Sequence, residues 1–467
     1  MFLLHIRAFA FLYLLEIGFG QSSSSSLCSI PKQEHKCLCS VVIDSELSYN
    51  VMHKLDCSRN GFDSFPDYQL ITEAGHLDLS FNKIEKLDGS VSNVENPVLH
   101  SLILSFNSIY YVSTDYFKNL PNLKHLDLSH NDIASFVNSN VFNGLSKLEV
   151  LDLSFNSIST LPEYIFYPLS GLRSLDISYN YLGALFTKLD NIFNSTLGLT
   201  KEINKLSMNG LDIKYVLHTF FDGANQLTYL SVADNPLLEV PTIPYSVTYL
   251  DISGTWVAVL QGKHLNYHSL QILKMNRMPN LRKIDRYAFY TLQSLIELEM
   301  NDNPNLKDLE SVAFGILSEK TDLHLKKMSV ARCGLKGVNE SYQFLFNKLD
   351  YIDLQGNPFT CDCNIFWLQK FEDSLNQKQN LRCVKPLRLR MKNILDLTHE
   401  DLPQCESEEN QKQKVIIIVL SVLIAVLIIF VVYLIYLGPL YYQNKYREIG
   451  PDSPYGLVVD IQPNRVE

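Results

Sequence analysis

The sequence predicts an α/β solenoid, a horseshoe whose concave side is a parallel sheet, with cysteine caps at both ends and one transmembrane helix. Three observations support this prediction. Octapeptides such as "LDLSFNKI" and "LDLSFNSI" recur along the chain, eight of the nine cysteines flank the recurring region, and 23 residues without a charge follow near the C-terminus.

The first twenty residues combine a weakly basic start, a short apolar stretch and small residues near Gly18 and Gly20. This pattern is typical of a secretory signal peptide. A retained signal anchor is the alternative, although the apolar stretch is short for a membrane span. We expect residues 1–20 to be removed and the following chain to be exported.

A template of the form LxxLxLxxNxI aligns thirteen copies over residues 52–358. Alternating apolar residues in each copy predict a short strand with one buried face. We therefore expect thirteen parallel strands, one from each repeat. Their central pairs begin at Leu55, Leu77, Leu102, Leu126, Leu151, Leu175, Leu206, Leu230, Leu250, Leu273, Leu298, Met328 and Ile352.

An asparagine follows the second apolar residue of most copies, where the chain must turn away from the strand. Its amide can satisfy backbone groups in the turn, so a column of asparagines predicts a hydrogen-bonded ladder. The residues are Asn82, Asn107, Asn131, Asn156, Asn180, Asn235, Asn303 and Asn357. Cys333 takes this place in the twelfth repeat, and we interpret it as a small buried substitute, with a reactive free thiol as the alternative.

Phenylalanines recur between the strands, in segments such as "VFNGLSKL" and "IFYPLSGL". We expect Phe117, Phe142, Phe166 and Phe289 to stack as a spine under the convex side.

Eight cysteines lie where a solenoid would otherwise expose its core, in an N-terminal cap over residues 28–57 and a C-terminal cap over residues 359–405. They are Cys28, Cys37, Cys39, Cys57, Cys361, Cys363, Cys383 and Cys405. In an exported protein disulfides are the preferred interpretation, and zinc binding by the CxC pair of the N-terminal group with further cysteines is the alternative. No metal site, catalytic residue or cofactor is otherwise expected.

These features resemble the extracellular leucine-rich-repeat superfamily, specifically the ~24-residue repeat of Toll-like receptor ectodomains and related single-pass surface proteins. The resemblance covers residues 28–405 and implies that Cys361 pairs with Cys383 and Cys363 with Cys405. It also implies that Trp367 and Leu368 close the core. The chain departs from the pattern where Leu211, Thr255 and Met278 replace the ladder asparagine.

The uncharged run over residues 415–437 is long enough to cross about 30 Å of hydrocarbon. We expect a stalk over residues 406–414, a transmembrane helix over 415–437 and a cytoplasmic tail over 438–467, in a single-pass type I plasma-membrane protein. In the tail, Tyr446 and Tyr455 fit a pattern read by endocytic adaptors and Tyr442 fits an SH2-docking pattern, with an unstructured tail as the alternative. Asn194 and Asn339 begin glycosylation sequons.

Two columns of side chains are expected beside the buried leucines on the concave side. One is acidic and contains Asp78, Asp127, Asp152, Asp176, Asp251 and Asp353. The other is aromatic and contains Phe81, Phe106, His130, Phe155 and Tyr179. Exposed aromatic residues in a row are typical of interface anchors. The structural alternative is that the aspartates keep the strands soluble and the aromatic rings shield the turns.

The expected architecture and the net charge limit the classes of function. An open strand ladder offers no enclosed pocket for an enzyme, and a net charge of −10 disfavours a nucleic-acid partner. The leading hypothesis is a cell-surface protein that binds an extracellular protein ligand, as an adhesion molecule or as a receptor or co-receptor without its own catalytic domain. The alternatives are an accessory subunit that grips another membrane protein, with Ser421 and Ala425 on its helix face, and a matrix anchor. Dimerisation is compatible with each.

Overall fold

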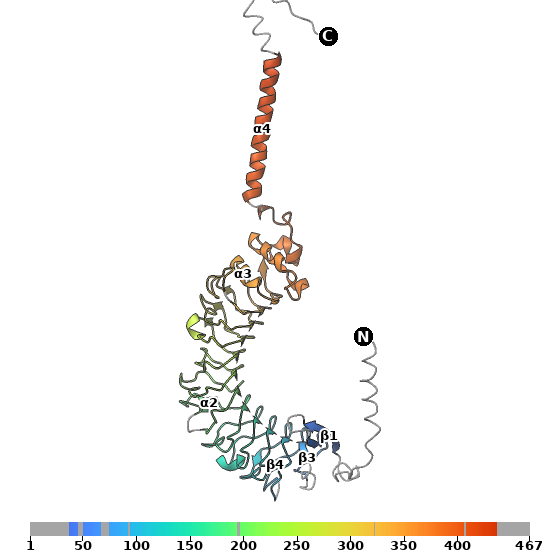
Figure 1. The fold of residues 1–467 in the computed structure, drawn as a ribbon, viewed down its shortest axis with the longest axis vertical. Coiled ribbons are helices and arrows are strands. Elements are labelled where there is room, and N and C mark those ends of the chain that lie inside the picture. Colours follow the sequence, from blue (N-terminus) through green and yellow to red (C-terminus); the bar gives the residue numbers. More distant parts are fainter. Residues whose placement is uncertain are drawn as a thin grey trace, which may run out of the picture. The chain divides into compact units, whose positions relative to one another are not determined.

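The computed structural model describes residues 37–44, 50–66, 74–91, 94–193, 197–321, 323–405 and 408–436. The chain divides into two compact units, residues 1–396 and 397–467. The first unit contains a curved solenoid and the second contains a long helix (Figure 1). The expected signal peptide, Cys28, the sequon at Asn194 and the tail tyrosines lie outside the described residues.

One sheet of fourteen strands runs through the solenoid in chain order, with a strand from every predicted repeat. Its strands are β1 (Leu38–Asp44), β2 (Asn50–Asp56), β3 (Ala74–Asp78), β5 (Ser101–Ile103), β7 (His125–Asp127), β8 (Val150–Asp152), β9 (Ser174–Asp176), β10 (Lys205–Ser207), β11 (Tyr229–Ser231), β12 (Tyr249–Asp251), β14 (Ile272–Lys274), β16 (Glu297–Glu299), β18 (Lys327–Ser329) and β19 (Tyr351–Asp353). The predicted thirteen strands and their parallel order are confirmed.

The fourteenth strand, β1, belongs to the N-terminal cap and pairs with β2 in antiparallel register, Leu38 opposite Asp56 and Asp44 opposite Asn50. A disulfide between Cys37 and Cys57 joins the open end of this hairpin. Repeat analysis missed β1 because the hairpin has no copy of the repeat template. It covers the first edge of the sheet, which would otherwise present unpaired backbone groups.

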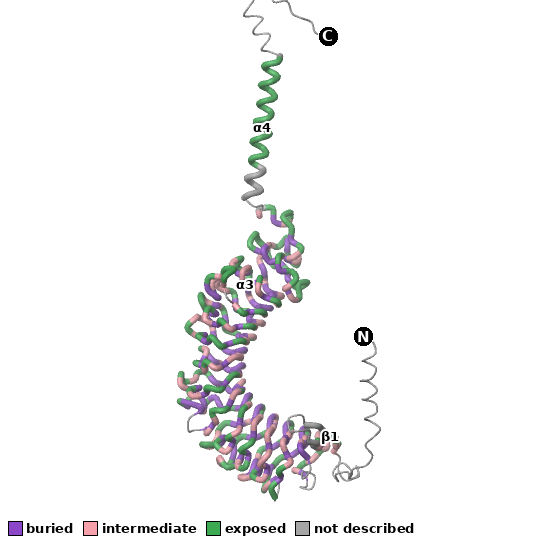
Figure 2. The backbone as a smooth tube through the Cα atoms, in the orientation of Figure 1, coloured by how far each residue is buried: buried purple, intermediate pink, exposed green. Residues whose placement is uncertain are grey.

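The repeats stack in register, so that each central leucine packs on the same residue of the next repeat. Leu102, Leu126, Leu151 and Leu175 face one another along four consecutive strands and are fully buried. Strands of three residues cannot hold a core by themselves. Each repeat is therefore stabilised by the apolar surface that its neighbours cover, and buried residues continue from one repeat to the next (Figure 2).

The ladder predicted from the asparagines is present. Asn131 is buried, its Nδ2 donates to the carbonyls of Leu104, Leu128 and Ser129 at 3.0–3.1 Å, and its Oδ1 accepts the N–H of Ile109 at 2.9 Å. The other asparagines of the column repeat this pattern, so each one links its own turn to the preceding repeat.

The twelfth repeat uses Cys333 in the same way. Its buried Sγ donates to the carbonyl of Met300 at 3.0 Å, the bond that an asparagine would make to the preceding repeat. Cys333 is the one free cysteine among the described residues, and burial raises the pKa of its thiol to about 12. The interpretation as a buried ladder residue is confirmed.

The convex side is made of turns and very short elements. They include β4 (Lys86–Leu87) with β6 (Tyr111–Val112), a second small sheet of β13 (Val259–Leu260), β15 (Lys283–Ile284) and β17 (Asp308–Leu309), and the single-turn helices α2 (Gly183–Phe186) and α3 (Gln343–Phe346). Beneath them, Phe117, Phe142 and Phe166 stack with ring centroids 6.5 and 6.4 Å apart, so the aromatic spine forms over three consecutive repeats. The expected fourth member, Phe289, is buried several repeats away and packs on Phe314 at 4.9 Å instead.

The C-terminal cap closes the last repeat. A disulfide joins Cys361 to Cys383, as the resemblance implies, and Cys363 and Cys405 are also disulfide-bonded. The 3-10 helix over Cys363–Phe371 buries Trp367 and Leu368, and the Trp367 ring lies 5.2 Å from that of Phe346. The core of the last repeats therefore ends on aromatic side chains instead of solvent.

In the second unit, α4 (Glu408–Tyr436) contains an apolar stretch over Val415–Ile435. It is the one helix in the described part of the chain that is long and apolar enough to cross a membrane. Its bounds agree with the expected span as far as the described residues extend.

Replacement of Asn131 by alanine should lower the free energy of unfolding by about 2–4 kcal/mol, because buried carbonyls and the Ile109 N–H lose their partner. Guanidinium unfolding of the detergent-solubilised chain, followed by tryptophan fluorescence, measures the loss. Asn225→Ala, at an exposed position, is the control and should change the free energy by less than about 0.5 kcal/mol. An equally small loss for Asn131→Ala would contradict a stabilising ladder.

The Cys333 thiol should resist alkylation in the native chain. With a pKa of about 12, only about one thiol in ten thousand is ionised at pH 8, and the thiolate is the reactive form. Iodoacetamide should therefore label Cys333 only after unfolding, where its pKa returns to about 8.5. Mass spectrometry of the Cys333 peptide measures the label, and rapid labelling of the native chain would favour the reactive-thiol alternative.

Candidate functional site

The predicted aromatic residues form one continuous stack. Ring centroids lie 4.3, 4.0, 4.2 and 4.3 Å apart along the series Phe81, Phe106, His130, Phe155 and Tyr179, with interplanar angles of 6–18°. We call these five residues the aromatic lane. Because neighbouring rings cover each other's faces, mainly the ring edges remain exposed, and the four lane residues other than His130 are 37–44% accessible.

The backbone conformation of the turns determines where the side chains of the aromatic lane lie. Each of its residues precedes a ladder asparagine and has φ between 52° and 55°, the left-handed conformation. Non-glycine residues adopt it at a cost of about 1–2 kcal/mol. The cost is offset because each lane N–H donates to a carbonyl of the next repeat, as Phe106 does to Ser129 at 3.2 Å, and because the rings stack. The lane therefore has a structural role whether or not it binds a partner.

A charged residue lies at each end of the aromatic lane. The Arg59 guanidinium lies 3.9 Å from the centre of the Phe81 ring. At the other end, the Tyr179 ring lies over Gly210, whose Cβ, if present, would come within 2.5 Å of it. The Tyr179 hydroxyl thus reaches two repeats ahead and donates to Asp234 Oδ2 at 2.8 Å, and Arg277 pairs with the other Asp234 oxygen at 3.4 Å.

The predicted aspartates Asp127, Asp152 and Asp176 lie directly opposite one another on β7, β8 and β9. Each Oδ1 accepts the N–H of the serine two residues later at 2.8–2.9 Å, so each carboxylate is held in one orientation at the end of its strand. Burial, together with the charges of Asp176 and Asp127, raises the pKa of Asp152 against these hydrogen bonds. The three carboxylates form an acidic strip with mutual repulsion.

A second surface on the same sheet was missed by sequence reasoning. Tyr229 and Tyr249 lie opposite each other on β11 and β12 and stack with centroids 4.2 Å apart. Lys205 Nζ lies 5.0 Å from the first ring, and Lys274 Nζ lies 6.0 Å from the second. Burial is the largest cause that raises the pKa of both tyrosines, so their hydroxyls are neutral at physiological pH. We call these four residues the tyrosine cluster.

An ion-pair network continues from the tyrosine cluster toward the C-terminal cap. Lys327 Nζ contacts Glu297 at 2.8 Å and Glu299 at 2.9 Å, and Lys274 contacts Glu299 at 3.4 Å. Burial opposes ionisation of Glu299, but the hydrogen bond from Lys327 and the charge of Lys274 lower its pKa to about 2. Most of these residues share the first outward position of their strands, a column that could have been found from the repeat alignment: Lys205, Tyr229, Tyr249, Glu297 and Lys327. Lys274 and Glu299 continue the column of the aspartates, since Lys274 lies opposite Asp251.

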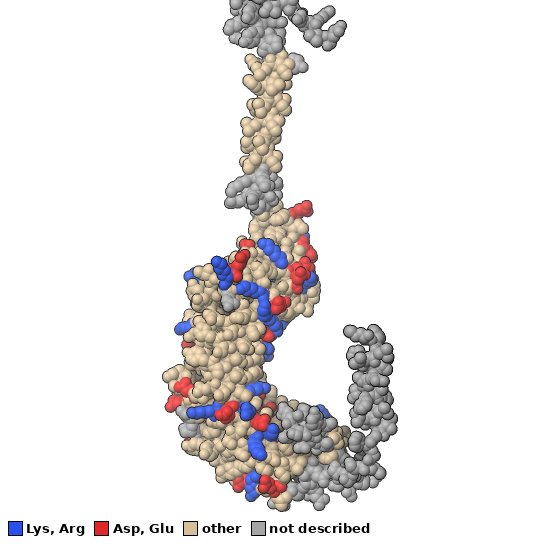
Figure 3. Space-filling model, in the orientation of Figure 1, with Lys and Arg blue, Asp and Glu red and all other residues tan. Residues whose placement is uncertain are grey.

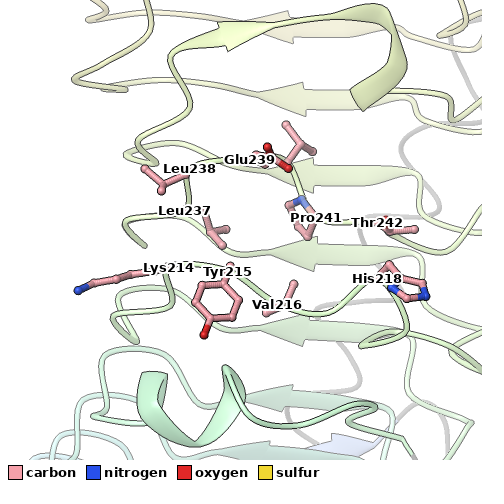
Figure 4. A pocket seen from close by; sticks show the side chains of 10 residues that line it. Lys214, Tyr215, Val216, His218, Leu237, Leu238, Glu239, Pro241 and Thr242 are labelled. Atoms are coloured by element: carbon pink, nitrogen blue, oxygen red, sulfur yellow. The ribbon is translucent and has the colours of Figure 1, made fainter.

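The described residues form several small pockets that are open to solvent. One of about 320 Å³ lies between the turns of repeats seven and eight, lined by residues such as Tyr215, His218, Leu238 and Pro241 (Figure 4). No group of three or more metal-ligating side chains occurs in the described ranges.

Asn339, which begins the second predicted sequon, is exposed and caps a helical turn by accepting the N–H of Ser341 at 2.9 Å. Exposed, pre-ordered aromatic and charged residues suit the binding of another macromolecule.

Comparison with known families agrees with the repeats. The family described as "Leucine rich repeat" matches residues 97–139 and 134–182, and the family described as "BspA type Leucine rich repeat region (6 copies)" matches residues 261–372. These ranges fall in both halves of the solenoid.

Relatives match over short segments. The chain is 39% identical to Tsukushi-A of Xenopus laevis over 79 residues, which are 17% of this chain and 22% of that protein. It is 34% identical to Amphoterin-induced protein 1 of Homo sapiens over 73 residues, 16% of this chain and 15% of that protein. The chain thus spans less than a quarter of these relatives.

Solved structures share the fold over most of the chain. A chain of the mouse RP105/MD-1 complex superposes with a TM-score of 0.51 and 21% identity, covering 72% of this chain and 55% of that one. A chain of the complex of Latrophilin 3, Unc5D and FLRT2 superposes with a TM-score of 0.51 and 20% identity, covering 78% and 99%. With thirteen repeats in register and disulfides in both caps, the chain has a leucine-rich-repeat fold and resembles extracellular proteins built from such repeats.

Proposed function

We propose that the chain is a single-pass cell-surface protein that binds an extracellular protein ligand through the concave side of its solenoid. The disulfides in both caps support an oxidising, extracellular setting, and the apolar helix α4 supports one membrane span. The two structural neighbours come from complexes with protein partners, which supports a protein as the ligand. Signal-peptide removal and type I orientation are part of the same proposal.

The observation that supports binding most directly is the order of the partly exposed concave side chains. The tyrosine cluster is held by ring stacking and by two lysines, and the acidic strip is held by serine N–H groups. Residues that are ordered before binding lose little conformational entropy when a partner arrives. Tyrosine is also enriched among the residues that contribute most to interfaces.

The accessory-subunit alternative depends on contacts of α4 with another helix. The Ser421 hydroxyl donates to the Ile418 carbonyl of its own helix at 2.7 Å, so its hydrogen bond is already used. We therefore favour recognition by the solenoid. Replacement of residues 415–437 by an unrelated membrane helix should leave ligand binding intact, and loss of function after this swap would support the accessory reading.

A partner should first be sought with the full-length chain displayed on cells and probed with a library of secreted and cell-surface proteins. For the partner found, Tyr229→Ser with Tyr249→Ser should weaken binding at least about tenfold, because two stacked anchors are lost. The matched control is Tyr287→Ser with Tyr290→Ser, an exposed pair in contact at 5.8 Å on another part of the solenoid. Equal binding by both double variants would contradict the tyrosine cluster as the site.

The aromatic lane is proposed as a second contact, because its residues follow the acidic strip by three positions. Phe106→Ser with Phe155→Ser removes the stacking partners on both sides of His130 and should reduce affinity for the same partner several-fold. The amount of variant displayed on the cell surface and its unfolding midpoint show whether it still folds. If both are unchanged, weaker binding results from the lost contacts. Unchanged binding by the folded variant would show that the lane is scaffold alone.

A further inference from the structure

A row of basic residues lies on the flank of the solenoid, apart from the concave side chains described above. Arg282, Lys307 and Lys336 directly follow the buried residues Leu281, Leu306 and Leu335, so each points away from the core. Lys385 of the C-terminal cap continues the series. We call these four cations the basic row.

Backbone hydrogen bonds show that the row is continuous. The N–H of Lys307 donates to the carbonyl of Arg282 at 3.1 Å, and the N–H of Gly334 donates to that of Leu306 at 3.0 Å. The N–H of Thr360 donates to the carbonyl of Lys336 at 2.8 Å. Thr360 in turn lies opposite Lys385 in the small sheet of β20 (Phe359–Thr360) and β21 (Cys383–Lys385). Four steps of about 4.8 Å give a row about 19 Å long.

Arg282 and Lys307 line one open groove of about 510 Å³ together with Asn280, Asn305, Lys283 and Asp308. Two carboxylates beside it are already engaged, since Lys283 contacts Glu310 at 2.9 Å and Asp285 at 3.6 Å. Asp308 is the one acidic residue among the six that line the groove, against three cations. By contrast, Arg282, Lys307 and Lys336 make no ion pair with any side chain in the described ranges. Their positive charge is therefore available to an outside anion.

The cap extends this basic region. Residues 378–392 contain six lysines or arginines and no acidic residue, on a chain whose net charge is −10. Arg382, Lys385, Arg388 and Arg390 are exposed there. Basic side chains are also visible along the C-terminal part of the solenoid, among acidic ones (Figure 3). A local excess of this kind on an acidic protein needs a reason other than solubility.

We propose that the basic row is a binding site for a sulfated glycosaminoglycan chain. A linear polyanion can contact cations spaced along adjacent strands, and its sulfates suit lysine and arginine as donors. The groove is open at the surface, so it can take a segment within a long polymer. The disulfide-bonded caps favour an extracellular polysaccharide over intracellular nucleic acid. The site is separate from the protein-binding surface proposed above.

The test uses the full-length chain in phosphatidylcholine nanodiscs and a heparin decasaccharide as the probe, titrated by calorimetry at several salt concentrations. The native chain should bind. Arg282→Gln with Lys307→Gln and Lys336→Gln should weaken binding at least about tenfold and reduce the slope of log K against log salt by about two to three, one for each lost contact. Neutral replacements at exposed sites preserve folding, which protection of the Cys333 thiol verifies.

The matched control is Lys118→Gln with Lys201→Gln and Lys263→Gln, three exposed lysines on separate repeats. It makes the same change in net charge and should bind heparin like the native chain. An equal loss in both triple variants, or no binding by the native chain at about 150 mM salt, would overturn the proposal.

Two further probes distinguish the class of anion. Single-stranded DNA of similar charge, or vesicles containing phosphatidylserine, should bind more weakly than heparin. Their affinity should also fall less than that of heparin when the basic row is substituted. Equal or tighter binding of either probe through the row would overturn the assignment to a sulfated polysaccharide. Protein-ligand binding by the tyrosine cluster is measured separately, so failure of one proposal leaves the other standing.

Discussion

The hydrogen-bonded turn that follows each strand is the constraint on which the rest of this structure depends. A solenoid buries the backbone of every turn against the next repeat, where water cannot satisfy it. The ladder asparagines supply both a donor and an acceptor across that junction, as Asn131 does. Two of the replacements remake a bond, the Thr255 hydroxyl to its own turn and the Cys333 thiol to the preceding repeat. At Leu211 and Met278 the side chain has no donor, and the backbone N–H of each donates to the ladder asparagine of the next repeat.

The same turn also dictates the outer surface beside the sheet. In all thirteen repeats the residue before the ladder position has positive φ, so these side chains project in one column. In the N-terminal half the column is aromatic and stacks, and in the C-terminal half it is ionic, with Arg332 paired to Asp302 at 2.8 Å. Gly210 and Gly254 lack a side chain where a neighbour crosses them. Stability of the turns and the chemistry of this surface are therefore linked.

The solenoid presents different chemistry on its different sides. The concave side carries neutral tyrosines, lysines held beside them and carboxylates held by serine N–H groups, an arrangement suited to a protein with mixed charge. The flank of the last repeats carries unpaired cations in a row, suited to a linear polyanion. Because the two surfaces lie on different positions of the repeat, the two proposed ligands would not compete for the same side chains.

The sequence by itself determined the repeat number, the thirteen strands, the ladder, the phenylalanine spine, the capping cysteines and the apolar helix, because each depends on local periodicity or on burial that every repeat copies. It did not determine β1, which has no repeated counterpart. It also missed the tyrosine cluster and the basic row, since Tyr229 and Tyr249, or Arg282 and Lys307, are more than 19 residues apart and meet only in the stacked sheet. Tertiary structure decided these surfaces because they are built across repeats, where strand register and not sequence distance sets which side chains are neighbours.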